Sequence, residues 1–362
     1  MRGPAARPTI QRAQSHFGHI LPARACVPLL FIAAPEYYIF DMSNVMHAQP
    51  HMNATIESFF HEPSSTWTHL AFDPLTRDAA LIDPVLDFDY AAGVTAPEAV
   101  QRIVAHVRAS GLRLQWILET HAHADHLSAA SHLREALGGR TAIGAGIRDV
   151  QAYFGRTLNF EPAFRTDGSQ FDHLFVDGER FQIGSLPALV IATPGHTRDS
   201  VSYLIGDALF AGDTLFMPDV GSARCDFPGG DAGVLYDSIR KLYELPERTR
   251  LFVCHDYAPA GREHRAQSSI GEQRRSNIHA RDGISRGQFI EMRRARDRTL
   301  GAPTLLYPAV QVNVRGGVPP PAESNGVAYL KVPMRTAAPR QAGDCARALD
   351  QPVPAAAIGA DT

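Results

Sequence analysis

The chain has 362 residues, of which 44% are hydrophobic and 20% charged, a composition typical of a globular protein with a sizeable core. Lys and Arg number 35 and Asp and Glu 38, so the net charge of -3 provides no basic excess for nucleic acid and no polybasic patch for a membrane surface. The longest apolar run, at 27–34, is too short to cross a bilayer. Cysteines at positions 26, 225, 254 and 345 form no CxxC pair and no disulfide framework, which predicts a reducing compartment.

The two ends of the chain differ in composition from the rest. Residues 1–51 are rich in Arg and Pro and contain no acid before Glu36. This predicts a disordered leader or a misassigned start, with an organellar transit peptide as the alternative. Without a transit peptide the protein is expected in the cytoplasm, and with one in the mitochondrial matrix. Residues 336–362 are predicted to be a disordered tail, so the globular domain is expected over 52–335, with a helical and strand extension at its C-terminal end.

Between these ends, runs with the apolar spacing of strands alternate with runs that have helical spacing. The predicted elements, in chain order, are strands at 66–72 and 79–83, a helix at 96–110, a strand at 112–118, a helix at 127–137, strands at 181–183, 188–192, 202–205 and 208–211, a helix at 231–242, a strand at 251–254, and helices at 263–276 and 285–299. Strands alternating with helices, together with hairpins, predict a layered α/β domain.

The placement of the 16 histidines is the most informative feature of the chain. The segment 120–126, THAHADH, brings together His121, His123, Asp125 and His126 directly after a predicted strand. A solvated polar loop is the alternative interpretation, but imidazoles crowded this closely repel one another when protonated, and a bound cation relieves that repulsion.

Three further fragments follow the same rule, with one His or Asp just past the end of an apolar strand and beside a residue that turns the chain. They are TPGHT with His196, GDT with Asp213 and CHDY with His255. Four such sites in series supply imidazole and carboxylate donors for one or two metal ions and need no cysteine ligand.

This series of motifs, HxHxDH followed by a His, an Asp and a His, resembles the metallo-β-lactamase superfamily over about residues 66–257. The resemblance implies an α/β fold, a four-layer αββα sandwich with metals at one edge. The superfamily carries diverse activities, so the fold alone does not define the reaction.

Two branches of the superfamily are similar to this chain. In a glyoxalase II-like thioester or lactone hydrolase, two Zn(II) ions would occupy all seven donors. In a persulfide dioxygenase, one Fe(II) per chain would be held by His121, His196 and Asp213, which would also be the catalytic residues. Such a site leaves positions for O₂ and for glutathione persulfide, whose sulfane sulfur is oxidised to sulfite.

Three stretches resemble the dioxygenase branch: 222–231, SARCDFPGGD, followed by LYDS at 235–238; EQRRSN at 272–277; and VNVRGG at 312–317. The chain departs from that pattern in having Ala223 where Gly is usual, in two extra residues between Asp213 and Arg224, and in longer ends. It is similar to the bacterial β-lactamase-hydrolase-like subgroup, for which the resemblance implies sulfur dioxygenase activity.

The resemblance also implies roles for other residues. His123, Asp125, His126 and His255 would hydrogen-bond the ligands or bind a second metal. Glutathione has two carboxylates, and donors for them would come from the three substrate-binding candidates Tyr257, Arg274 and Arg224. A structural ion pair or packing role is the alternative for each of these three, and for Arg224 the expected partner is Asp226 or another acid.

A few residues and properties keep more than one interpretation. Cys225 and Cys254 are interpreted as buried apolar side chains, with oxidation near a metal as the alternative. Glu119 fits either an acid or a structural hydrogen bond, and Arg315 is expected to be a solvated residue at a strand end.

Partners are expected to be small molecules only, with neither nucleic acid nor membrane, and a homodimer is one option for assembly. A non-catalytic metal-binding protein is a third hypothesis, which the complete donor set disfavours.

Overall fold

The structure is a computed structural model of the chain that describes residues 53–334. The predicted leader at 1–51 and the predicted tail at 336–362 lie outside the described residues. Everything described below belongs to one unit of the chain, residues 41–362.

Two six-stranded sheets and one small sheet form the β structure of residues 53–334. The first sheet has the order β1 (Thr55–His61), β2 (Thr66–Phe72), β3 (Asp78–Ile82), β6 (Arg113–Leu118), β8 (Arg140–Gly144) and β9 (His173–Phe175). The second has the order β10 (Arg180–Ile183), β11 (Leu186–Ala192), β12 (Val201–Ile205), β13 (Ala208–Phe210), β14 (Arg250–Phe252) and β15 (Gln267–Ser269). The small sheet has the order β5 (Val94–Ala96), β4 (Val85–Asp89) and β7 (Leu127–Ser128).

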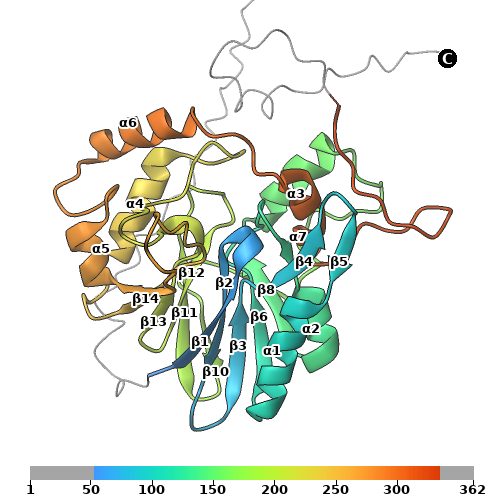
Figure 1. Cartoon of the computed structure of the whole chain (residues 1–362), viewed down its shortest axis with the longest axis horizontal. Helices are drawn as coiled ribbons and strands as arrows, with labels where there is room; N and C mark the ends of the chain where they lie inside the picture. Colours follow the sequence, from blue (N-terminus) through green and yellow to red (C-terminus); the bar gives the residue numbers. More distant parts are fainter. Residues whose placement is uncertain (1–52, 335–362) are drawn as a thin grey trace, which may run out of the picture. The chain divides into compact units, whose positions relative to one another are not determined.

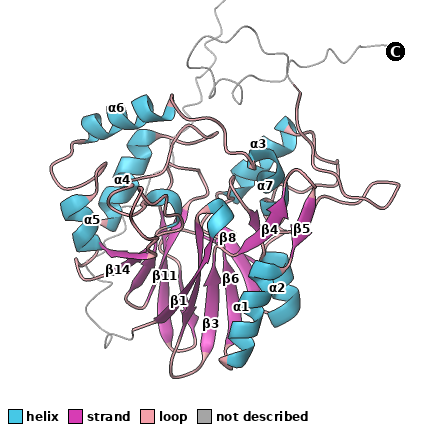
Figure 2. Ribbon diagram, viewed as in Figure 1, coloured by secondary structure: helices cyan, strands magenta, loops and turns pink. Residues whose placement is uncertain are grey.

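Helices cover the outer faces of the two large sheets (Figures 1 and 2). They are α1 (Glu98–Ala109), α2 (Ala130–Leu137), α3 (Ile147–Thr157), α4 (Ala232–Leu242), α5 (Ile270–Ser276), α6 (Arg286–Asp297) and α7 (Leu306–Asn313), with short 3-10 turns at Glu62–Ser64 and Gly212–Thr214. Of these, α1, α2 and α7 pack on the first sheet, and α4, α5 and α6 pack on the second. The layers are therefore helix, sheet, sheet, helix, as predicted for the αββα sandwich.

Strand β3 explains why residues 79–82 are apolar without interruption. Its side chains alternate between the two faces of the first sheet. Ala80 and Ile82 belong to the core between the two sheets, whereas Ala79 and Leu81 belong to the core beneath α1, α2 and α7. Because both faces are covered, neither set of positions can be polar.

Strand direction brings the polar loops to one edge of the sandwich. Strands β3, β6 and β8 run parallel to one another, so their C-terminal ends lie at the same edge of the first sheet. In the second sheet, β13 and β14 are parallel, and β11 has the same direction because two antiparallel pairings separate it from β13. The loops after β6, β11, β13 and β14 therefore meet.

The predicted strands and the helices α1, α4 and α6 are found within one to three residues of the predicted bounds. Asp231, the predicted first residue of α4, caps it by accepting hydrogen bonds from the amides of Gly233 and Val234. Two helix predictions were too long at their starts. Residues 127–128 pair with β4 before α2 begins at Ala130, and β15 occupies 267–269 before Ser269 caps α5.

The prediction that Arg315 is a solvated residue at a strand end is wrong. After Tyr257 the described chain contains the strand β15 and the helices α5, α6 and α7. Residues 306–313 form α7, and after it the Arg315 guanidinium is 8% exposed and pairs with both carboxylate oxygens of Glu161, at 2.7 and 2.9 Å. It also lies 4.6 and 4.4 Å from the ring centroids of Phe160 and Phe164. The local pattern at 312–317 did not contain these partners, because they follow α3 about 150 residues earlier. No helix within 53–334 is long and apolar enough to cross a membrane.

Arg315→Ala should lower the free energy of unfolding by about 2–3 kcal/mol, because it removes a buried cation that is both ion-paired and packed on two rings. Urea unfolding followed by circular dichroism measures the change. Arg165→Ala is the matched control, since the Arg165–Asp167 ion pair is solvent-exposed and its loss should cost less than about 0.5 kcal/mol. Equal losses for the two variants would contradict the assigned role of Arg315.

Candidate metal centre

Two imidazoles and one carboxylate converge at the edge where the polar loops meet. His121 follows β6, His196 follows β11 and Asp213 lies in the turn after β13. Nε2 of His196 is 3.5 Å and Nε2 of His121 is 3.9 Å from Oδ2 of Asp213. One donor atom from each residue lies within 4.8 Å of the other two, and all three residues are buried. This group could hold one metal ion.

Contacts at Nδ1 fix the ring orientations of the two histidines. Nδ1 of His196 donates to the carbonyl oxygen of Arg224 at 2.7 Å, and Nδ1 of His121 lies 3.0 Å from the hydroxyl of Thr120. Both contacts leave Nε2 directed at the site, an arrangement typical of metal-binding histidines. Burial, followed by the charges of His123 and the neighbouring imidazoles, lowers the pKa of His121 well below its usual value, which keeps the ring neutral, as a metal ligand must be.

A second group of donors lies beside the first. Nε2 of His255 is 3.2 Å from Oδ2 of Asp125 and 3.4 Å from Oδ1 of Asp213, and the His126 ring centroid is 6.0 Å from that of His255. Burial lowers the pKa of His126 to about 3. Four of these buried atoms have no hydrogen-bond partner within the described residues: Nε2 of His126, Nε2 of His255, Oδ2 of Asp125 and Oδ1 of Asp213. Unpartnered buried polar atoms are costly, so this donor set fits a cation.

His123 is held differently from the other histidines. Its Nε2 is 3.0 Å from Oδ1 of Asp83 and 3.7 Å from Oε2 of Glu119, whereas its buried Nδ1 has no partner within the described residues. Burial opposes protonation, but the Asp83 charge outweighs it and raises the pKa of His123 to about 10. With Nδ1 deprotonated and Nε2 donating to Asp83, the ring could still bind a metal.

Asp83 anchors the whole histidine segment, and the sequence analysis did not single it out. Besides His123, its carboxylate accepts hydrogen bonds from the Thr120 amide at 2.7 Å and the Thr120 hydroxyl at 3.0 Å. Its φ of 50° lies in the left-handed region, which Asp tolerates better than most residues. The sequence did contain a signal for Asp83. It follows a strand and precedes a proline, which is the same placement that identified the metal donors.

Two further side chains support the segment. Nδ2 of Asn313 donates to the carbonyl oxygens of His123 and His126, both at 2.8 Å, and its Oδ1 accepts from the Ser128 amide. Glu119 is buried and accepts a hydrogen bond from the Ser128 hydroxyl, and burial raises the pKa of Glu119 to about 8. The structure therefore agrees with the interpretation of Glu119 as the acceptor of a structural hydrogen bond.

Helix α6 supports the loop that orients His196. Arg293 is 1% exposed, pairs with Asp297 at 2.7 Å and donates to the carbonyl oxygen of Ser222 at 3.0 Å. The second oxygen of Asp297 accepts from the Cys225 amide at 2.9 Å. The backbone between these two contacts carries the Arg224 carbonyl to which His196 donates.

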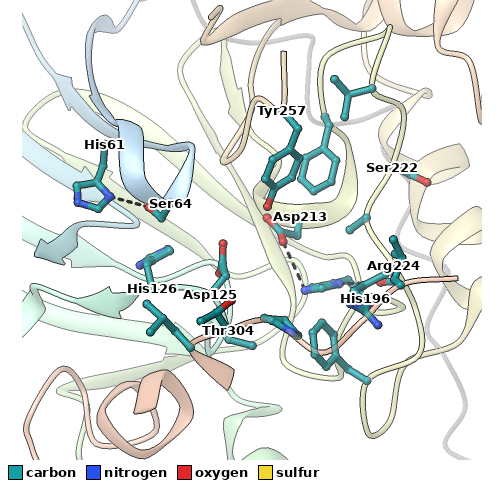
Figure 3. Close-up of a pocket in the computed structure, with 18 of the residues that line it drawn as sticks. His61, Ser64, Asp125, His126, His196, Asp213, Ser222, Arg224, Tyr257 and Thr304 are labelled. Carbon is teal, nitrogen blue, oxygen red and sulfur yellow. Dashed lines mark hydrogen bonds and ion pairs between the residues drawn. The ribbon is translucent and has the colours of Figure 1, made fainter. Parts of the chain in front are cut away.

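Four of the seven donors border a cavity of about 910 Å³, within the range of small-molecule sites. They are His126, Asp125, His196 and Asp213, whose side chains line the cavity (Figure 3). Tyr257, half-exposed, lines the cavity and stacks on the His255 ring at a centroid distance of 5.5 Å. Apolar side chains make up much of the remaining wall: Leu86, Phe88, Phe216, Val220, Phe227, Ile278, Leu300, Pro303 and Leu305.

The structure brings together all seven predicted metal donors, and of the three predicted substrate contacts it places Tyr257 and Arg224 at the cavity. Arg224 donates two hydrogen bonds to Asp226, the expected partner, and a third to the Gly301 carbonyl. Arg274 is not at the cavity. It lies on α5, where its guanidinium pairs with Asp282 at 2.9 Å, because the helix turns that face toward the surface acids.

Both cysteines that flank the site are buried thiols without a disulfide partner, and burial raises the pKa of each. Cys254 also lies within 4.8 Å, through its sulfur, of donor atoms of His123, His126 and His255. Their burial agrees with the interpretation as apolar side chains.

Residues 75–255 match the metallo-beta-lactamase superfamily, and this stretch includes all seven donors. The chain belongs to that superfamily. Among its superfamily relatives, a probable metallo-hydrolase of Burkholderia pseudomallei is 48% identical over 77% of this chain and 99% of the relative. Glyoxylase B2 of Dictyostelium discoideum is 48% identical over 78% of this chain and 97% of its own length. The mitochondrial persulfide dioxygenase ETHE1 of Bos taurus is 30% identical over 74% of this chain and 90% of its own length.

A solved structure of the superfamily agrees with this fold. The crystal structure of ETHE1 from Myxococcus xanthus superposes with a TM-score of 0.58 and 34% sequence identity, covering 73% of this chain and 99% of that protein.

Asp83→Asn should weaken metal binding about 10–100-fold, because Asn keeps the backbone conformation but replaces the charge that holds His123 and Thr120. Titration of the metal-loaded protein with a chromophoric chelator measures the affinity, and the melting temperature of the metal-free variant verifies folding. Asp282→Asn, at a surface acid paired with Arg274, is the control and should bind metal like the unmodified protein. An unchanged affinity in Asp83→Asn would show that Asp83 does not position the ligands.

Proposed function

We propose that the chain is a persulfide dioxygenase that uses a single ferrous ion held by His121, His196 and Asp213. The reaction converts glutathione persulfide, O₂ and water into glutathione, sulfite and two protons. The sulfane sulfur is oxidised by four electrons, which reduce O₂. The S–S bond breaks, and the carrier leaves as a thiolate that takes up one proton from water.

The observation that carries the proposal is the composition of the converging trio. Two imidazoles and one carboxylate form a group of their own, whereas His123 groups with Asp83 and Glu119 or with the second set of donors. Two histidines and one carboxylate on one face of a metal are the ligand set typical of non-haem Fe(II) oxygenases. When bound, the ferrous ion would supply the redox chemistry that a hydrolytic site does not need.

The chain's own residues would bind and orient the substrate. Phe227 packs edge-on against His196 at a centroid distance of 5.2 Å, and with Phe216 it forms an apolar wall that excludes water from the sulfur. A persulfide is already anionic near neutral pH, so no residue is required as a strong general base. The name of the Bos taurus relative supports the reaction class.

A binuclear zinc hydrolase of thioesters or lactones is the second candidate, and one observation favours it. The buried atoms of Asp125, His126 and His255 that lack partners, together with Nδ1 of His123, provide enough donors for a second ion. A pair of zinc ions would lower the pKa of a bound water and so generate a nucleophile. The names of the relatives from Burkholderia pseudomallei and Dictyostelium discoideum agree with this chemistry.

Metal analysis and O₂ consumption of anaerobically purified protein test the proposal. We expect about one iron per chain and consumption of one O₂ per glutathione persulfide. Asp213→Ala should lose the iron and at least about 100-fold of the rate, since it removes the only carboxylate of the trio. Asp237→Ala, at a surface acid paired with Arg286, should retain both. Two zinc ions per chain, with hydrolysis of S-lactoylglutathione and no O₂ uptake, would refute the dioxygenase.

His123→Ala separates the two candidate functions. With a single iron on the trio, the variant should keep about one metal per chain, because His123 would not be a ligand. In a binuclear site it would be a ligand, and the metal content should fall to about one ion or fewer from two. Metal content of the variant and of the unmodified protein, prepared side by side, decides between these outcomes. Loss of most of the iron in His123→Ala would contradict the trio as the complete ligand set.

A further inference from the structure

Three arginines line the cavity, and two of them are engaged within the protein. Arg224 donates to Asp226 and to the Gly301 carbonyl. Arg293 is buried against Asp297 and Ser222. Both guanidinium groups therefore hold the loop that orients His196, and a substrate carboxylate would compete with these contacts.

The third arginine, Arg296, is free of such contacts. It lies one turn after Arg293 on α6, is exposed and lines the cavity. Within residues 53–334 its side chain forms no hydrogen bond and no ion pair. Burial lowers the pKa of His279 to about 4, and the charges of Arg293 and Arg296 add to this shift.

No acid of the cavity neutralises this guanidinium. Three acidic residues line the cavity: Asp125, Asp213 and Asp219. Asp125 and Asp213 belong to the metal donors, and Asp219 pairs with Arg262 at 2.6 Å. An unpaired guanidinium beside a cavity is suited to bind a carboxylate from solution, because its fork of N–H groups matches the two oxygens.

The size of the cavity indicates a carrier that extends beyond the reacting sulfur. The volume of about 910 Å³ lies near the upper end of the range for small-molecule sites. The chain that leaves α6 continues this wall with Leu300, Pro303 and Leu305. A substrate with its sulfur at the metal donors and an apolar stem along this wall would place a terminal anion near α6.

We propose that Arg296 binds a carboxylate of the thiol carrier and thereby makes the site selective for carboxylate-bearing carriers such as glutathione. The inference takes the reacting sulfur from the proposed function and adds the group that recognises the carrier. Arg296 is a specificity-determining residue that replaces Arg274 in this role.

Calorimetric binding to the metal-loaded full chain tests the inference with two non-reacting probes, S-methylglutathione and its dimethyl ester. The unmodified protein should bind the acid about tenfold more tightly than the ester, the ratio expected for one partly exposed charged hydrogen bond. Arg296→Ala should bring the ratio near one by weakening only the acid. Arg296→Lys should retain part of the ratio. The matched control is Arg294→Ala, at an exposed residue of the same helix that does not line the cavity, and it should keep the full ratio.

An unchanged ratio in Arg296→Ala, a ratio of one in the unmodified protein, or no binding of either probe would overturn the inference. The measurement is independent of the reaction, because neither probe carries a persulfide. If O₂ uptake fails but the ratio collapses in Arg296→Ala, carrier recognition stands and the proposed function falls. If O₂ uptake occurs and the ratio persists, the proposed function stands and Arg296 is not the carboxylate contact.

Discussion

The structure depends on one constraint: imidazoles and carboxylates are buried together at the sandwich edge with donor atoms directed at one another. Several of these atoms have no partner among the described residues, and polar atoms in that condition destabilise a fold unless something compensates them. A divalent cation compensates several such atoms at once, and ligands in a preformed site bind it without further ordering. The chemistry of the site and the stability of this edge are therefore linked.

The scaffold holds the donors in place through residues that do not themselves complete the trio. Asp83, at the end of β3, fixes the start of the histidine segment, and Asn313, at the end of α7, fixes its remaining carbonyls. Helix α6 holds the loop behind His196 through Arg293 and Asp297. Elements from both ends of the described chain thus converge on a site that lies between them, which explains why the C-terminal helices belong to the functional unit.

The same edge can serve more than one reaction, because the donor set exceeds what one metal needs. The trio of His121, His196 and Asp213 suits a redox metal with vacant positions, whereas the additional donors suit a second ion. The superfamily match defines the fold and the metal-binding character. The cavity wall, with its apolar residues and the unpaired Arg296, then distinguishes substrates by their carriers.

The sequence by itself determined the seven candidate donors and most strand and helix positions, and its resemblance to the superfamily implied the order of the layers. The candidates could be found because they lie in four segments that follow apolar strands beside turn residues, and strand direction brings such ends together. Only the tertiary structure decided which side chains support those donors and which cations face the cavity. Asp83, Asn313 and the partners of Arg315 meet their contacts across long separations in the chain. Arg274 lies on the face of α5 that meets surface acids, whereas Arg296 lies on the face of α6 that lines the cavity. A local pattern contains neither a distant partner nor the rotation of a helix against its neighbours, since packing sets both.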